Sequence, residues 1–69
     1  MRKRVKLIQF RIGLNFNQEQ MAKYCNISRS TYGEIERGET DGSLDFWNTL
    51  KTKGNLSLED IWAMQYESK

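Results

Sequence analysis

The sequence contains no histidine, no proline and only one cysteine. A single thiol rules out an internal disulfide, and without histidine the chain lacks the ligand set of a zinc finger or another conventional metal cluster. No apolar run approaches the roughly 18 residues that a membrane-spanning helix requires. Because a lone thiol and the lack of a signal sequence suit a reducing compartment, we expect a cytoplasmic protein with no metal, cofactor or membrane partner.

The 69 residues suffice for one small domain, and we predict a single domain over residues 1–69. A core of this size contributes only a few kcal/mol, so a partner subunit is expected to add stability. The net charge of +2 is too small to indicate nucleic-acid binding on its own. Basic residues nevertheless gather near the start and acidic residues near the end, namely Arg2, Lys3, Arg4 and Lys6 against Glu59, Asp60 and Glu67. This asymmetry fits a domain oriented on a phosphate backbone, and it fits a solvated helix start equally well.

Residues 18–36 contain two short helical patterns joined by a tight turn. The first pattern carries three apolar side chains at helical spacing, Met21, Ala22 and Cys25. Asn26 interrupts it, because asparagine is one of the few residues that tolerates a left-handed backbone. Ser28 then caps a second helix, whose spacing is supplied by Thr31, Tyr32 and Ile35. A helix, a turn of about four residues and a helix that begins with small polar and basic side chains form the arrangement that places side chains in a DNA groove.

The first helix is predicted over about residues 2–14. Its core face is formed by Leu7, Phe10, Arg11 and Leu14. Asn15 is expected to end it in a left-handed conformation, and Asn17 is expected to cap the next helix.

Two more helices follow the pair, over about residues 44–53 and from residue 58 onward. Each begins after a serine cap, Ser43 and Ser57, and the earlier one ends at Gly54 and Asn55. We predict that their core faces consist of Leu44, Trp47 and Leu50 in one and of Leu58, Ile61 and Trp62 in the other. No strand pattern competes, so the fold class is all-α with five short helices around one core.

The order and spacing of these residues resemble the Cro/repressor (XRE-type) helix-turn-helix family of bacteria and their phages. The matching positions are Asn17-Gln18, Met21-Ala22, Ile27 to Tyr32 and Ile35 to Gly38, and the likeness covers about residues 5–63. It implies a compact five-helix, repressor-like DNA-binding domain with the helix-turn-helix at about residues 18–36. It also implies that Arg11 and Glu36 form a structural ion pair, since the family has such a pair at these positions.

The resemblance places the base-reading positions on the third helix, at Arg29, Ser30 and Glu34. Arg29 can span the two acceptors that guanine presents in the major groove, a contact worth about 1–3 kcal/mol of discrimination. Ser30 can donate or accept and therefore indicates no particular base. Glu34 can accept from a cytosine amino group, and pairing with Arg29 at helical spacing explains it equally well.

The phosphate-contacting positions implied by the resemblance are Gln18, Thr31, Tyr32 and Asn17. Gln18 begins the second helix, where free backbone amides favour an anion, and its side-chain amide can donate to a phosphate. Thr31 either touches phosphate or packs at the edge of the turn. For Tyr32, core packing is the favoured interpretation, with the hydroxyl reaching the DNA backbone. Gly33 is unusual inside a helix and would permit close approach to DNA or to another helix.

A second apolar stripe on the first helix, Val5, Ile8 and Ile12, either contacts the fifth helix through Trp62 or forms a dimer surface with Phe46, Met64 and Tyr66. Our functional prediction is a sequence-specific DNA-binding transcriptional regulator, a small repressor of the phage Cro-like or mobile-element kind, which binds double-stranded operator DNA as a homodimer. The alternatives are an antitoxin with the same fold and a protein-interaction module, and the acidic loop that holds Glu39 and Asp41 supports only the second. An enzyme is not expected, because Cys25 lacks a base and no paired carboxylates form a recognisable constellation.

Overall fold

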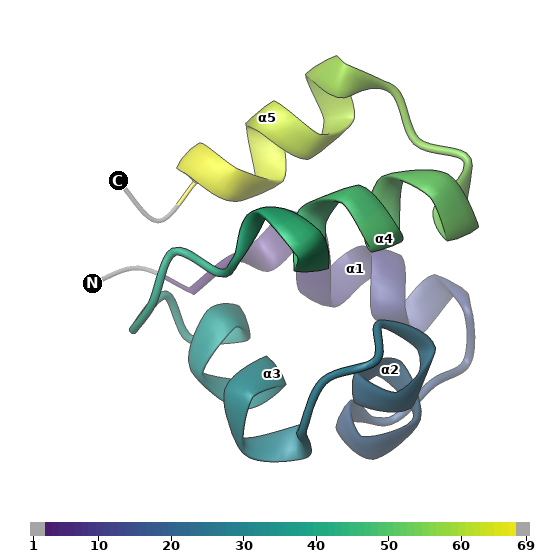
Figure 1. Ribbon diagram of the computed structural model, residues 1–69, viewed down its shortest axis with the longest axis vertical. Helices are drawn as coiled ribbons and strands as arrows, with labels where there is room; N and C mark the ends of the chain where they lie inside the picture. The colour runs from purple at the N-terminus through teal and green to yellow at the C-terminus, as the bar shows by residue number, and fades with distance from the viewer. Residues whose placement is uncertain (1–2, 68–69) are drawn as a thin grey trace.

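The computed structural model describes residues 3–67, and within this range it consists of five helices and no strand. The helices are α1 (Val5–Gly13), α2 (Gln18–Tyr24), α3 (Arg29–Glu36), α4 (Leu44–Gly54) and α5 (Leu58–Tyr66) (Figure 1). The all-α fold class predicted from the sequence is therefore confirmed. Arg2, at which the first helix was expected to begin, lies outside the described residues.

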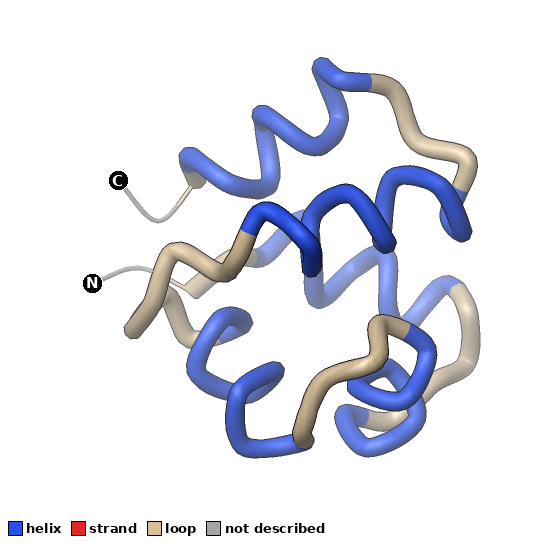
Figure 2. The backbone as a smooth tube through the Cα atoms, in the orientation of Figure 1, coloured by secondary structure: helices blue, strands red, loops and turns tan. Residues whose placement is uncertain are grey.

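The helices form two groups that are joined by α1. Helices α2 and α3 pack against each other across the tight turn, α4 packs against α5, and α1 contacts both α3 and α5. Figure 2 shows the short loops that connect them, with the longest one running between α3 and α4. This arrangement leaves one side of the α2–α3 pair directed away from the rest of the molecule (Figure 1).

The helix boundaries follow from local chemistry, as the sequence predicted. Four side chains cap the helices that follow them, each accepting from the backbone N–H three residues on, and they are Asn17, Ser28, Ser43 and Ser57. Three asparagines adopt the left-handed conformation after a helix, Asn15 at φ 61°, Asn26 at φ 60° and Asn55 at φ 53°. These predicted caps and ends are confirmed, because each depends only on residues within the same few positions.

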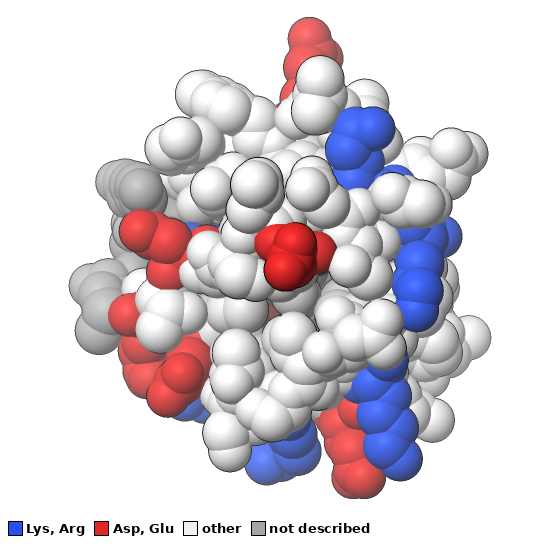
Figure 3. Space-filling view, in the orientation of Figure 1, with Lys and Arg blue, Asp and Glu red and all other residues white. Residues whose placement is uncertain are grey.

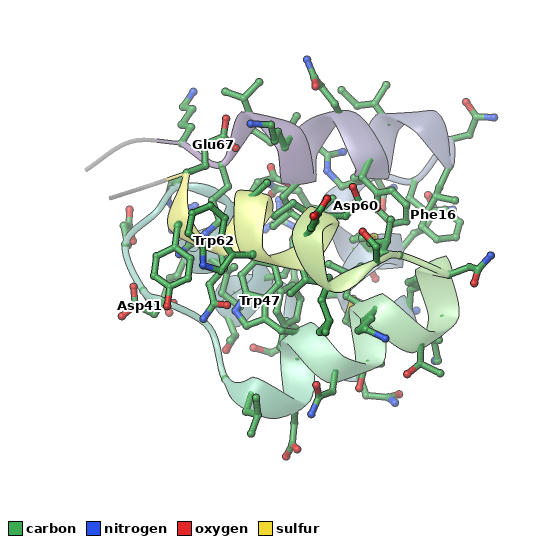
Figure 4. All side chains as sticks on the ribbon, turned by 90° about the horizontal axis from the view of Figure 1, so that it is seen from above. Phe16, Asp41, Trp47, Asp60, Trp62 and Glu67 are labelled. Atoms are coloured by element: carbon green, nitrogen blue, oxygen red, sulfur yellow. The ribbon has the colours of Figure 1, made fainter. Side chains whose placement is uncertain are left out.

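Helix α1 begins later than predicted, at Val5. The backbone of Arg4 is not helical (φ −82°, ψ 82°), and its N–H donates to the carbonyl of Glu36 at 2.8 Å. Arg4 supplies no side-chain cap, and a carboxylate from the far end of the chain contributes instead: Glu67 Oε1 accepts from the backbone N–H of Lys6 at 2.8 Å. Figure 4 shows Glu67 beside the start of α1. The position at which the first helix begins is therefore determined by contacts with residues far along the chain.

The core lies between the two helix groups and contains eleven buried apolar residues, namely Leu7, Met21, Ala22, Cys25, Tyr32, Ile35, Phe46, Trp47, Leu50, Ile61 and Met64. Cys25 is a buried free thiol, in agreement with its interpretation as a small hydrophobe, and burial raises its pKa to about 11. Trp47 is fixed by a hydrogen bond from Nε1 to the carbonyl of Asp41 at 2.9 Å. This contact requires Gly42 at φ 80°, where an added Cβ would lie 2.9 Å from the same Nε1 atom.

The predicted core faces of the last two helices were partly wrong. Leu44 and Leu58 are the first residues of α4 and α5, and both are largely exposed. Trp62 is 64% exposed, whereas Ile61 is buried as predicted. Since Leu58 and Trp62 are four residues apart, they share a stripe that the helix turns outward while Ile61 and Met64 face inward.

The proposed dimer residues were also partly misplaced. Phe46 and Met64 are core residues, so they cannot belong to a surface. Val5 and Ile12 remain exposed although α1 contacts α5, and Tyr66 is exposed with its ring 5.1 Å from that of Trp62. The exposed apolar residues of α5 are therefore Leu58, Trp62 and Tyr66, which we call the α5 stripe.

Candidate nucleic-acid interface

The first turn of α3 presents small polar and basic side chains to solvent. Ser28 Oγ accepts from the N–H of Thr31 at 3.1 Å and donates to Thr31 Oγ1 at 2.8 Å, which fixes the start of the helix. Arg29 and Ser30 follow the cap and are exposed. Within residues 3–67 the Arg29 side chain makes no hydrogen bond or ion pair, so nothing in that range holds it away from a ligand.

Glu34 lies one turn further along α3 and is half-buried. The ion pairs found among residues 3–67 do not include one between Glu34 and Arg29. The Glu34–Arg29 ion pair, which was the alternative explanation for Glu34, is therefore not found among residues 3–67. The base contacts of Arg29, Ser30 and Glu34 stay predictions.

The buried carboxylate of Glu36, at the end of α3, connects this helix with α1 and α2. Glu36 is 4% exposed and accepts from Arg11 Nε at 2.8 Å, which is the ion pair that the resemblance implies. Arg11 also donates through Nη1 to the carbonyl of Phe16 at 3.0 Å. Gln18 donates from Nε2 to the other Glu36 oxygen at 2.9 Å. The network therefore fixes α1, the start of α2 and the end of α3 relative to one another.

The protonation of Glu36 is controlled by this network. Burial alone would raise its pKa, but the hydrogen bonds from Arg11 and Gln18 outweigh burial and hold the pKa below the ordinary value. The nearby Tyr32 hydroxyl also favours the charged carboxylate, although it lies outside hydrogen-bonding geometry. Arg11 responds in the opposite direction, because the hydrogen bond to Glu36 raises its pKa. Both groups are therefore charged at neutral pH.

Two of the predicted phosphate contacts sit at the start of α2. The oxygen of the Asn17 side chain accepts from the N–H of Gln20 at 2.8 Å, which leaves the exposed amide nitrogen for other partners. The Gln18 amide nitrogen carries two hydrogens, and the bond to Glu36 uses one of them. The second remains for an anion, so a phosphate contact from Gln18 is compatible with its structural bond. Thr31 is exposed, and its hydroxyl oxygen accepts from Ser28, which leaves the Thr31 hydroxyl hydrogen available to a phosphate.

Tyr32 does not lie where a phosphate contact would require it. The residue is 0% exposed, and its ring packs with a centroid distance of 6.3 Å to that of Phe46. Its hydroxyl is buried without a hydrogen-bond partner among residues 3–67, and burial raises its pKa. The phosphate contact predicted for Tyr32 was therefore wrong, and the core packing that was favoured for it is found. The Tyr32 side chain points inward because Tyr32 lies on the inner face of α3, whereas Thr31 is exposed.

Arg4 is the residue whose role the sequence did not reveal. It is 0% exposed, so for Arg4 neither interpretation of the basic residues near the start holds, the orientation on a phosphate backbone or the solvated helix start. Nη1 donates to the carbonyls of Ile35 at 2.6 Å and Thr40 at 2.7 Å, and Nη2 donates to that of Gln65 at 3.2 Å. The guanidinium carbon also lies 5.6 Å from the ring centroid of Trp47. Arg4 thus connects the end of α3, the loop that follows it and the end of α5.

The surface charge is uneven around this region. Figure 3 shows acidic side chains grouped beside the loop between α3 and α4, and basic side chains along the opposite edge beside α2 and the end of α4. The loop carboxylate of Glu39 is paired with Arg37, with Nε and Oε2 separated by 2.7 Å. Asp41 Oδ1 lies 3.9 Å from Arg4 Nη2, so both carboxylates that the sequence placed near the expected phosphate path have partners within the protein.

The comparisons with known proteins agree with this arrangement. A family model described as Helix-turn-helix matches residues 7–46, which cover α1, α2, α3 and the start of α4. A protein named "Uncharacterized HTH-type transcriptional regulator" from Archaeoglobus fulgidus is 33% identical over 67 residues, which span 97% of this chain and 92% of the relative. No solved structure matches. The chain belongs to the XRE-type helix-turn-helix family. Among the residues described, none of the helices has the length and apolar character needed to cross a membrane.

Proposed function

We propose that this protein is a sequence-specific DNA-binding regulator of transcription, and that it acts as a repressor by inserting the first turn of α3 into the major groove of an operator. The observation that carries this proposal is an exposed Arg29 that has no partner among residues 3–67, on a helix whose other end is anchored by Glu36. A rigidly held helix with a free leading arginine is what direct base reading requires. Family membership and the name of the archaeal relative support the same class of function.

Arg29→Ala is expected to lower the preference for the operator over random DNA by about 5- to 150-fold, which corresponds to the loss of about 1–3 kcal/mol of base discrimination. The free energy of unfolding should not change, because Arg29 is exposed and has no partner within residues 3–67. The measurement is a binding titration with DNA that flanks the gene and with random DNA, at two salt concentrations.

Lys23→Ala is the matched control for this titration. Its side chain is 79% exposed and its ammonium group pairs only loosely with Glu19 at 3.8 Å, so the variant removes the same charge without touching α3. It should retain the sequence preference even where overall affinity falls. Equal preference in Arg29→Ala and wild type would contradict base reading by Arg29. If wild type shows no salt-dependent affinity for any DNA, the protein-interaction alternative replaces the proposal.

We extend the proposal to a homodimer that forms through the α5 stripe. Leu58 is 74% exposed and Trp62 is 64% exposed, and together with Glu59 they line a hollow of about 560 Å³. A core of this size contributes little stability alone, so burying this stripe against a second copy would add to it. Two-fold pairing would place the α3 helices about 34 Å apart, which matches one turn of B-DNA and an operator with inverted half-sites.

Trp62→Glu is expected to shift the protein from dimer to monomer, because it puts a carboxylate in the centre of the α5 stripe. Sedimentation equilibrium measures the mass, and a titration with full and half operators measures the consequence. Affinity for the full operator should fall, whereas affinity for a single half-site should stay the same. An unchanged mass in Trp62→Glu, or a wild type that is monomeric on DNA as well as free, would exclude this dimer.

A further inference from the structure

Arg37 follows α3 directly, and its guanidinium is folded back along the helix. It pairs with Glu39 in a two-pronged arrangement, with Nε 2.7 Å from Oε2 and Nη2 3.2 Å from Oε1. The third nitrogen, Nη1, lies over Gly33, where an added Cβ would be only 3.0 Å away. The glycine in the middle of α3 therefore leaves the space that this conformation of Arg37 occupies.

The same arginine borders a hollow that faces the start of α2. The hollow has a volume of about 200 Å³ and is lined by Lys3, Ile8, Gln18, Glu36 and Arg37. Gln18 has one amide hydrogen left after its bond to Glu36, and the lining includes two cationic residues, Arg37 and Lys3. A DNA phosphate that Gln18 binds would therefore lie next to Arg37.

Carboxylate and phosphate groups compete for an arginine fork in the same way. Both offer two oxygens at a spacing that matches two parallel N–H groups of the guanidinium. In the free protein both oxygens of Glu39 occupy this fork. The hydrogen bond lowers the pKa of Glu39 and raises that of Arg37, so the pair stays charged around neutral pH.

We propose that Arg37 is a phosphate-binding residue of the DNA interface and that Glu39 is its built-in competitor, which must be displaced when DNA binds. This inference rests on the proposed DNA-binding function. Glu39 then lowers the affinity of the protein for the DNA phosphate backbone. It weakens binding to every DNA sequence by a similar factor and does not affect base reading by α3. Gly33 is part of the device, because it allows the guanidinium to lie within reach of both partners.

The test is a double-mutant cycle of Arg37→Ala, Glu39→Gln and the double variant, with operator and random DNA at several salt concentrations. Glu39→Gln is expected to raise affinity for both DNAs by about three- to tenfold and to steepen the dependence on salt by up to about one counterion. Arg37→Ala should weaken both. In the double variant the gain from Glu39→Gln should vanish, because the carboxylate acts only through Arg37.

Asp45→Asn serves as the charge-matched control, since Asp45 is an exposed acidic residue in the first turn of α4. It should raise affinity less than Glu39→Gln does, and equally with or without Arg37. A gain from Glu39→Gln that is the same in the Arg37→Ala background would show a general charge effect and overturn the inference. So would the absence of any gain in a wild type that binds DNA. A wild type without DNA affinity would overturn the inference and the proposed function together.

Discussion

Arg4→Met is expected to lower the free energy of unfolding by about 3–5 kcal/mol, because three main-chain carbonyls lose their hydrogen bonds to the buried guanidinium and each acceptor left unsatisfied costs about 1–3 kcal/mol. The variant keeps an unbranched side chain that fills part of the same space, but it removes the donors to three main-chain carbonyls, those of Ile35, Thr40 and Gln65. A domain of this size has little more than that amount in total. Urea unfolding followed by tryptophan fluorescence and circular dichroism should therefore show a largely unfolded protein at room temperature.

Lys6→Met provides the matched control for Arg4→Met, because it removes the same charge two residues away from an exposed side chain. The Lys6 contact to Glu67 is made by the backbone N–H and survives the substitution. Its stability should stay within about 0.5 kcal/mol of wild type. Arg4→Lys retains the charge but not the planar fork, so it should fall between the two. If Arg4→Met and Lys6→Met unfold at the same urea concentration, the buried guanidinium does not hold these elements together.

The contrast between Arg4 and the helix caps shows what could be predicted from the sequence. A cap such as Ser28 bonds to a residue three positions away, so the sequence nearby contains all the necessary information. The carbonyls that bind Arg4 lie 31, 36 and 61 residues along the chain, and they are main-chain atoms without any residue signature. The role of Arg4 could therefore not be predicted before the tertiary packing was known.

The errors in burial have a related cause. Apolar spacing shows that a helix has an inner face but not where that face begins in the first turn. Leu44 and Leu58 directly follow the caps and were assigned to the core, whereas the packing of α4 and α5 turns them outward. For Tyr32 the error ran the other way, because a buried residue was also assigned a phosphate contact at the surface. Its position in the pattern did not reveal that the hydroxyl is enclosed.

The candidate interface was predictable to the extent that it depends on the order of residues along α2 and α3. The cap at Ser28 and the exposure of Arg29 and Ser30 follow from that order. The bond of Gln18 to Glu36 and the pair between Arg37 and Glu39 do not. These partners come from different parts of the fold, so they are decided by how the helices pack and how the loop after α3 turns.

Glu36→Gln is expected to lower the free energy of unfolding by about 3 kcal/mol at neutral pH, because it leaves the partly buried Arg11 without its counter-charge. The variant should also alter the acid sensitivity of the protein. The folded pKa of Glu36 lies below the ordinary value of 4.5, so its stabilising effect is fully present above pH 4.5. As the pH falls through this lowered pKa, Glu36 becomes protonated and the wild type should lose the stability that the charged carboxylate contributes. Glu36→Gln lacks this carboxylate, so its stability should not show the same loss. Urea unfolding between pH 3 and pH 7 should therefore show the two curves converging in acid.

The double variant Arg11→Met/Glu36→Gln tests the cause of the lost stability. It separates the loss of the ion pair from the cost of leaving the Arg11 charge without a counter-charge. Removing both charges leaves no charge without a counter-charge, so the double variant should be more stable than the sum of the single losses predicts. Strictly additive losses, or parallel pH curves for wild type and Glu36→Gln, would contradict a buried pair that stabilises through charge. Because Arg11 and Glu36 are assigned no contact with DNA, loss of DNA affinity in these variants should follow the fraction of unfolded protein. Arg29→Ala should lose sequence preference while fully folded, and this difference separates the residues that hold the reading helix from the residue that reads.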